Sequence, residues 1–309
     1  SGYGALYTNT GGNNTASGWK ALYFNTTASY NVASGLQALY YNTTGGSNIA
    51  TGYKALYNNT TASYNTASGY EALYTNSTGE KNTASGTSAL RSNTTANQNT
   101  AFGYMALYTN TTGYNNTASG MHALYANTTG TWNTASGTSA LYSNTTASHN
   151  TAVGYKALNL NTTGDLNTAT GKNALLYNTT GAYNAAGGVS ASQANTTGSY
   201  NTSFGNSAGG LTTTGSYNSC LGYNAQPSSA TVDDEVVLGD NHIATLRCNT
   251  STISSLSDAR DKVEVEPSPL GVDFLNTLNP VKFLWQSREG NSKDGTHEIG
   301  FIAQELQEV

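Results

Sequence analysis

The sequence predicts a mainly β protein: a repetitive parallel β-roll or β-helix built from 17-residue coils, followed by a small α+β segment. The main observation is a glycine that returns every 17 residues from Gly18 to Gly222. The second is a composition dominated by Gly, Asn, Thr, Ser, Ala and Tyr, in which only 9% of residues are charged. A disordered chain has no reason to keep a fixed register, so the repeat indicates a solenoid whose coils bury their inner faces against one another.

Each coil is a variant of Asn-Thr-Ala-Ser-Gly-Tyr-x-Ala-Leu-Tyr-x-Asn-Thr-Thr-Gly-x-Tyr, and its positions are numbered here from the glycine as position 0. Position −4 is Asn from Asn14 to Asn218, and position +3 is Ala from Ala5 to Ala225. Leu fills position +4 in eleven copies, from Leu6 to Leu175, and Asn fills position +7 in twelve, from Asn9 to Asn195. These positions are therefore expected to lie inside the solenoid.

The repeat predicts two short strands per coil and no helix. Thr-Ala-Ser-Gly-Tyr alternates small inward residues with outward ones, as a half-buried strand does. Asn-Thr-Thr-Gly supplies a turn, because Asn and Gly tolerate left-handed backbone conformations. Coils stacked at ~4.8 Å give a shaft of roughly 60 Å over twelve intervals, with identical Asn side chains forming hydrogen-bonded ladders.

An interior of Ala and Gly is narrow and buries little apolar surface. We therefore expect the Leu residues and the tyrosines at position +5 to bury the remainder between chains, with three chains around one axis. Those tyrosines are Tyr7, Tyr23, Tyr40, Tyr57, Tyr74, Tyr108, Tyr125 and Tyr142.

Both ends of the repeat depart from the consensus. The first interval, from Gly2 to Gly18, is one residue short, and the deletion falls in the turn at residues 9–11. At the other end Ser192, Gly209 and Gln226 replace the Leu, which predicts a terminal cap. Cys220 stands where most coils have Ala and is expected to be a small buried thiol.

The charge distribution excludes several functions. Residues 1–222 carry six basic and three acidic side chains, and residues 223–309 carry six basic and fourteen acidic ones, so no basic face suggests nucleic acid. No run of 18 apolar residues is present, and no signal peptide begins at Ser1, so membrane insertion is not expected. We expect no cofactor.

The shaft itself offers little chemistry. Its acids, Glu71, Glu80 and Asp165, are scattered singly, whereas glycoside hydrolysis needs two facing carboxylates. His122 and His149 stand alone as well, so no metal site is expected. The Asn-Thr-Thr triplets match the glycosylation sequon but are interpreted as turns. Exposed tyrosines either pack on neighbouring coils or stack on sugar rings as a repetitive surface for a host glycan.

The repeats resemble the heads of trimeric autotransporter adhesins and related viral fibre repeats. The similarity lies in runs such as residues 65–69, Asn-Thr-Ala-Ser-Gly, followed by Ala72-Leu73. It covers residues 1–226, which we assign to the shaft, and implies left-handed parallel β-rolls with three chains side by side. Residues 227–256 are expected to be a connector with short strands at 236–239 and 243–247.

The remaining segment, residues 257–309, resembles the start of the intramolecular chaperone domain of the endosialidase type, found at the ends of phage tail fibres and tailspikes. The similarity lies in Ser-Asp-Ala-Arg-Asp-Lys at 257–262, in residues 275–285 and in residues 300–306. It implies a trimerising domain that cuts itself away in a single turnover, without an external substrate. By this resemblance Ser257 is the nucleophile and Lys262 its base, with Arg260 and Asp258 as supporting residues.

The chain begins inside a repeat at Ser1 and reaches Val309 before such a domain is complete, so we expect it to be a piece of a longer protein. The sequence favours a structural and host-attachment fibre of a phage-like virus, located in the virion. Its expected partners are two further copies of itself, a host cell-surface glycan or protein receptor, and other tail proteins. The alternatives are a bacterial surface adhesin with a trimeric β-roll head and a glycan-degrading tailspike.

Overall fold

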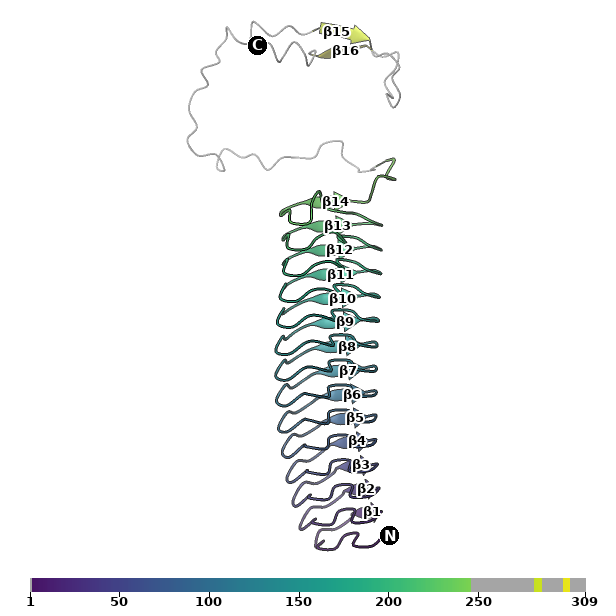
Figure 1. Cartoon of the computed structure of the whole chain (residues 1–309), viewed down its shortest axis with the longest axis vertical. Helices are drawn as coiled ribbons and strands as arrows, with labels where there is room; N and C mark the ends of the chain where they lie inside the picture. The colour runs from purple at the N-terminus through teal and green to yellow at the C-terminus, as the bar shows by residue number, and fades with distance from the viewer. Residues whose placement is uncertain (1, 246–280, 285–296, 301–309) are drawn as a thin grey trace, which may run out of the picture. The chain divides into compact units, whose positions relative to one another are not determined.

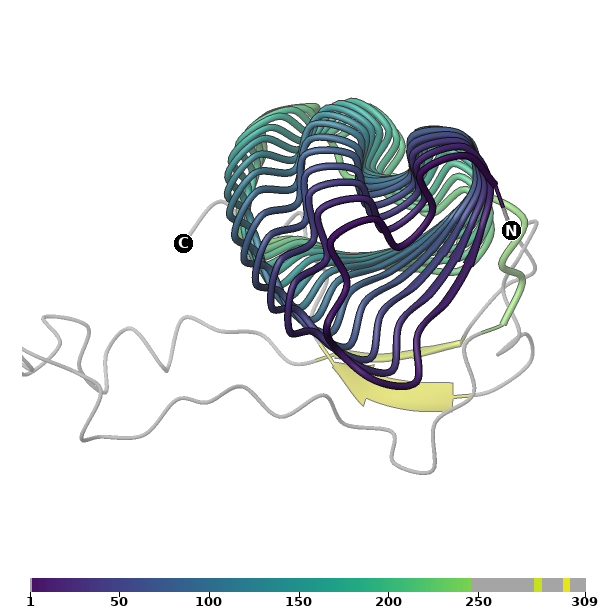
Figure 2. The same ribbon diagram turned by 90° about the horizontal axis from the view of Figure 1, so that it is seen from below.

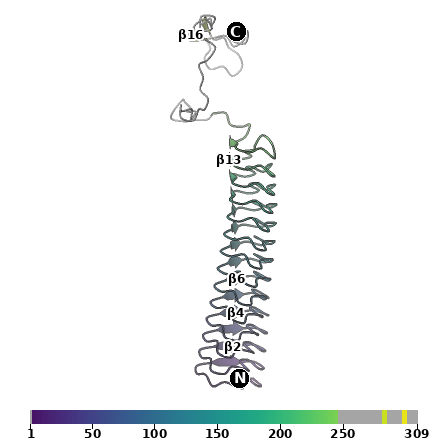
Figure 3. The same cartoon turned by 90° about the vertical axis from the view of Figure 1, so that its left-hand side faces the viewer.

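The computed structural model describes residues 2–245, 281–284 and 297–300, and the chain divides into two units, Ser1–Leu246 and Arg247–Val309. The first unit is a solenoid with fourteen strands of three residues each (Figures 1 and 3). They are β1 Thr15–Ser17, β2 Val32–Ser34, β3 Ile49–Thr51, β4 Thr66–Ser68, β5 Thr83–Ser85, β6 Thr100–Phe102, β7 Thr117–Ser119, β8 Thr134–Ser136, β9 Thr151–Val153, β10 Thr168–Thr170, β11 Ala185–Gly187, β12 Thr202–Phe204, β13 Ser219–Leu221 and β14 Val236–Leu238.

All fourteen strands form one parallel sheet in sequence order, and each residue pairs with the residue 17 positions further on. Ala67 of β4, for example, lies beside Ala84 of β5. Viewed along the axis, successive coils follow nearly the same path (Figure 2). The predicted 17-residue parallel β-solenoid is confirmed, and its described residues contain strands and turns but no helix.

Each coil has one strand, so the prediction of two strands per coil is wrong. The rest of the coil is held in turns by left-handed backbone conformations, as at Tyr64 (φ 62°), Glu71 (φ 52°) and Leu73 (φ 51°). An extended strand cannot contain such residues. The sequence is adapted to them, because none of the described non-glycine residues with positive φ is a β-branched Val, Ile or Thr.

The repeating glycine is required by the close approach of neighbouring coils. At Gly137, φ is 136°, and an added Cβ would lie 2.5 Å from the carbonyl oxygen of Gly154 in the next coil. No side chain fits there, and only glycine adopts this backbone conformation easily. The coil spacing therefore depends on glycine at position 0.

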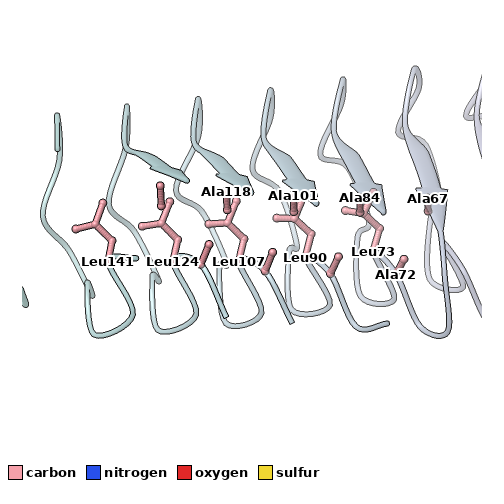
Figure 4. Close-up of a cluster of buried hydrophobic side chains, with 14 of the residues drawn as sticks. Ala67, Ala72, Leu73, Ala84, Leu90, Ala101, Leu107, Ala118, Leu124 and Leu141 are labelled. Atoms are coloured by element: carbon pink, nitrogen blue, oxygen red, sulfur yellow. The ribbon is translucent and has the colours of Figure 1, made fainter. Parts of the chain in front are cut away.

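The core is a column of leucines packed against two columns of alanines (Figure 4). Leu73, Leu90, Leu107 and the equivalent leucines of the other complete coils are fully buried, as are the alanines at positions −2 and +3. The expectation that the leucines are buried between chains is therefore wrong. The turns fold position +4 inward, so one chain covers its own leucines.

Two Asn ladders satisfy the polar groups inside the solenoid, as predicted. At position +7, Nδ2 of Asn127 donates to Oδ1 of Asn110 at 2.7 Å and to the carbonyl of Gly130 at 3.0 Å. At position −4, the backbone N–H of Asn133 donates to Oδ1 of Asn116 at 3.0 Å. Each amide thus ties its own coil to its neighbour, and both kinds of Asn are almost entirely inaccessible to solvent.

The ends of the solenoid keep the coil path while the side chains change. Near the start, Asn25 bonds through Nδ2 to Oδ1 of Asn9, 16 residues earlier, whereas the N–H of Asn31 bonds to Oδ1 of Asn14, 17 residues earlier. The missing residue is therefore absorbed in the turn between Asn9 and Asn14, as predicted. Further on, Ser192 and Ser203 replace Leu and Ala and share a 2.8 Å hydrogen bond. Cys220 is buried, as predicted, and burial raises the pKa of its thiol.

The sheet continues past residue 226 into the segment expected to be a connector. Strand β14 pairs with β13 in the same 17-residue register. Glu235 takes the place of the ladder Asn: its N–H donates to Oδ1 of Asn218 at 3.0 Å, and its carboxylate accepts the N–H of Ser228 at 2.8 Å. Ile243–Thr245, the described part of the second expected strand, is not a strand.

In the second unit, the described residues form two antiparallel strands, β15 Val281–Leu284 and β16 His297–Gly300. Val281 pairs with Gly300 and Leu284 with His297. Both strands lie in or beside the sequence segments that resemble the chaperone domain.

Removing one ladder amide should destabilise the solenoid. In Asn127→Ala, Oδ1 of Asn110 loses its donor and Nδ2 of Asn144 loses one acceptor, 2.9 Å away. We expect the free energy of unfolding to fall by about 1–3 kcal/mol for each buried group left unpaired. Denaturant titration measures this fall. Thr129→Ala, an exposed site in the same coil, is the control and should change little; equal losses in both variants would contradict the ladder.

The ladder can also be lengthened. It stops at Asn195, whose Oδ1 is buried without a partner, because Thr212 stands at position +7 of the next coil. Thr212→Asn should supply the missing donor and raise the free energy of unfolding by about 1 kcal/mol. Thr214→Asn, on the exposed turn of the same coil, is the matched control. If both variants unfold at the same denaturant concentration, pairing of the Asn195 oxygen does not stabilise the solenoid.

Candidate functional site

The predicted self-cleavage residues Ser257, Asp258, Arg260 and Lys262 lie outside the described residues. Their roles therefore remain predictions. The residues that the structure does describe place the other candidate functional groups on the surface of the solenoid, where each position of the coil forms a column along the axis.

The tyrosines at position +5 form a stacked column within one chain. Tyr23, Tyr40, Tyr57 and Tyr74 follow one another with ring centroids 5.2–5.4 Å apart and nearly parallel planes. These rings are half-buried or nearly buried, so they contribute to coil stacking and leave only edges for a ligand. The expectation that they are buried only between chains is thus replaced by packing on neighbouring coils.

Arg91 takes the place of one tyrosine in this column. Its guanidinium lies 5.1 Å from the ring centroid of Tyr74 and 5.9 Å from that of Tyr108, which continues the stack by cation–π contacts. Its Nε also donates to Oε2 of Glu71 at 2.8 Å. Glu71 is therefore already paired and is not a free acid.

The other carboxylates of residues 1–222 are too far apart for glycoside hydrolysis. Glu80 and Asp165 both occupy position −6, five coils apart, which corresponds to ~24 Å at the strand spacing. Catalytic carboxylate pairs lie about 5–9.5 Å apart. Within residues 2–245 and the two described strands of the second unit, no three His, Cys, Asp or Glu side chains come together as metal ligands.

The two histidines of the shaft contact aromatic side chains. The His122 ring lies 5.4 Å from the ring of Tyr104 and 5.4 Å from that of Tyr125. His149 is exposed and stacks on Trp132 at 6.3 Å. His149 is therefore a surface residue, whereas His122 is half-buried.

The Asn-Thr-Thr triplets are structural. Their Asn residues are the ladder amides at position +7, and Asn25 and Asn42 are fully buried. A glycosyltransferase cannot reach them in the folded solenoid. This supports the interpretation of the triplets as turns.

An open groove of about 560 Å³ runs beside the N-terminal coils. Phe24 and Tyr41 line it with stacked rings 5.4 Å apart, beside Thr26, Thr43 and Thr60. Each of these three hydroxyls donates to a carbonyl of the next coil at 2.9–3.1 Å, so a ligand would have to supply the donors, as sugar hydroxyls do. The sequence patterns above do not predict a site at Phe24 and Tyr41. The signal that could have indicated one is the pair of aromatic residues 17 positions apart at position +6.

A second exposed aromatic group lies near the C-terminal end of the solenoid. Tyr183, Tyr200 and Tyr217 at position −5 stack with centroids 4.8 and 4.9 Å apart, and about half of each side chain is exposed. Because these rings cover one another's faces, the row presents its ring edges and hydroxyl groups to solvent, where sugars can contact them. It fits the predicted repetitive surface better than a single pocket does.

No helix in the described residues is long and apolar enough to cross a membrane. Residues 257–309 match the family model described as "Chaperone of endosialidase". No curated protein and no solved structure matches the chain. The chain is therefore a parallel β-solenoid that carries a C-terminal endosialidase-chaperone segment, and a segment of this family implies assembly into a trimer. The match confirms the resemblance stated for these residues.

The tyrosine column predicts a pH dependence. Burial, followed by a hydrogen bond with Tyr41, raises the pKa of Tyr57 from 10 to about 12. Between these values the folded chain keeps the proton that the unfolded chain loses, so stability is full below pH 10 and falls as the pH rises to about 12. Tyr57→Phe should show a shallower fall of the thermal midpoint across this range, with Tyr64→Phe, an exposed tyrosine, as control. Identical slopes would rule out a contribution from Tyr57.

Proposed function

We propose that this chain is part of a structural and host-attachment fibre of a phage-like virus, and that it works as a homotrimer assembled by its C-terminal segment. The observation that carries this proposal is the chaperone-family match at residues 257–309, in a chain whose preceding residues form a long solenoid with few charges. A bacterial adhesin head shares the solenoid, but the chaperone segment favours the fibre.

The repetitive shaft explains why such a helper is needed. Identical coils can pair between chains in many registers, each shifted by 17 residues and nearly equal in energy. A trimeric domain at one end aligns the chains before the shafts pack. Its removal would then make the assembly kinetically trapped rather than reversible.

Self-cleavage follows the chemistry of an activated serine. A lysine can act as a base when burial lowers its pKa, and in this scheme Lys262 takes the proton of the Ser257 hydroxyl. The hydroxyl oxygen attacks the carbonyl of Leu256, the peptide C–N bond breaks, and the nitrogen of Ser257 receives the proton from Lys262. Water then hydrolyses the resulting ester, which leaves a carboxylate on Leu256 and a free hydroxyl on Ser257. In this scheme Arg260 and Asp258 orient the reacting backbone.

Host attachment rests on the solenoid surface. The groove at Phe24 and Tyr41 offers apolar ring surface beside threonine hydroxyls that can accept hydrogen bonds, and Tyr183, Tyr200 and Tyr217 offer exposed ring edges. A host cell-surface glycan fits this chemistry, through many weak contacts along the shaft. The exterior of the virion is the matching location, and other tail proteins would hold the end of the fibre.

Cleavage and assembly are tested together. On a denaturing gel the unaltered chain should yield residues 1–256 and the released segment, whereas Ser257→Ala and Lys262→Met should remain at 32.1 kDa. Ser255→Ala, two residues away, is the control and should be cut normally. By native mass spectrometry Ser257→Ala should show three chains. Normal processing of Ser257→Ala would disprove the proposed nucleophile, and a single-chain mass would disprove the trimer.

A further inference from the structure

One side of the solenoid gathers most of the exposed apolar residues. This sheet side comprises the outward positions −3 and −1 of strands β1–β14 and position +1 after the glycine. Of the 33 exposed large hydrophobic residues among the described ones, ten lie at position +1, five at −1 and three at −3. They include Trp19, Ile49, Phe102, Tyr155 and Leu221.

The same side almost lacks charge. None of the 28 outward positions in β1–β14 is charged, and position +1 carries two charged residues, Lys172 and Asp240. The other charged residues of residues 1–222 occupy other positions, and those at +2 form a charged margin beside position +1. The ammonium groups of three lysines there lie 4.5–5.4 Å from the centroids of position +1 rings: Lys20 over Trp19, Lys54 over Tyr53 and Lys156 over Tyr155. Depletion of charge is typical of the centre of a protein interface, and a charged margin is typical of its rim.

The sheet side is large enough for a stable interface. Five residues from −3 to +1 span ~13 Å, and thirteen strand intervals span ~62 Å, which gives roughly 800 Å². Stable complexes bury about 800 Å² per partner. Eighteen of the 28 outward strand positions are Ser or Thr, so this side is an uncharged surface on which exposed apolar residues alternate with hydroxyl groups.

The periodicity indicates what covers this surface. On the sheet side, each coil presents the same outward positions, and successive coils follow at ~4.8 Å along the whole solenoid. A partner that fills it throughout must be a straight rod with the same spacing, and another copy of this chain has that spacing. We propose that the sheet side is the surface through which copies of this chain pack against one another, an inference that rests on the proposed trimer.

The sheet side also restricts the register of that packing. Large residues at position −1 stand 51 residues apart at Phe102, Val153 and Phe204, with Ser, Thr or Gly in the coils between them, and Leu221 and Leu238 follow in the next two coils. The Phe204 ring lies over Gly187 of the preceding coil, where an added Cβ would meet it at 2.5 Å. A slip of one coil would place Phe102 level with Ser119 of the neighbour. A slip of three coils matches Phe102 with Val153 and Val153 with Phe204, but it leaves three coils uncovered in each copy.

Thiol accessibility tests this proposal. Ser136→Cys lies on the sheet side, and Thr146→Cys lies ten residues further along the chain at position +9; both native residues are exposed in the single chain. Both variants are made in the full chain with Ser257→Ala to keep it intact and Cys248→Ser to remove the second thiol. Cys220 is 1% exposed and does not react in the folded protein. A maleimide is the probe, and native mass is recorded on the same samples.

We expect a three-chain mass, with labelling of Cys at 136 slower than at 146 by roughly tenfold or more. In guanidinium chloride both thiols should react at the same rate. A three-chain mass with equal labelling of the two thiols would show that the sheet side is not the interface, although the chain is a trimer. The same conclusion would follow if only the thiol at 146 were protected. A single-chain mass with both thiols labelled would overturn the trimer itself and the sheet side with it.

Discussion

The structure depends on the close approach of successive coils at position 0. At Gly137 an added Cβ would meet the next coil at 2.5 Å, so only glycine permits the backbones to approach at the spacing of a parallel sheet. At that spacing each Asn amide reaches the equivalent amide of the next coil, as between Asn127 and Asn110 at 2.7 Å. The ladders, the tyrosine column and the leucine core all follow from this constraint.

The solenoid stabilises itself with small residues and amides rather than with a large apolar core. Ala and Leu fill a narrow interior, and buried Asn side chains replace the polar contacts that water would make. Because a single chain already covers its leucines, self-association has to use another surface. The exposed apolar sheet side has the area and the low charge for it.

In the proposed function, assembly guided by the C-terminal segment is a consequence of repetition. A shaft whose coils are nearly identical carries little information about register, and the C-terminal segment that matches the endosialidase chaperone family provides an external reference. The three-coil spacing of Phe102, Val153 and Phe204 adds a second, internal one. Together they reduce the number of misaligned assemblies that a trimer would otherwise sample.

The period, the parallel solenoid and the ladders followed from residue spacing alone, because a strict 17-residue repeat allows few other structures. The resemblance of residues 257–309 rested on the motifs of that segment, and the family match confirms it. The number of strands per coil did not follow, since left-handed residues such as Glu71 and Leu73 are not special residue types and their conformation is imposed by the neighbouring coils. Likewise, the spacing could not show that Leu73 points into its own chain, or that Phe24 and Tyr41 form a groove. Those features depend on how each turn directs its side chains in three dimensions, and this is set by contacts between residues 17 positions apart.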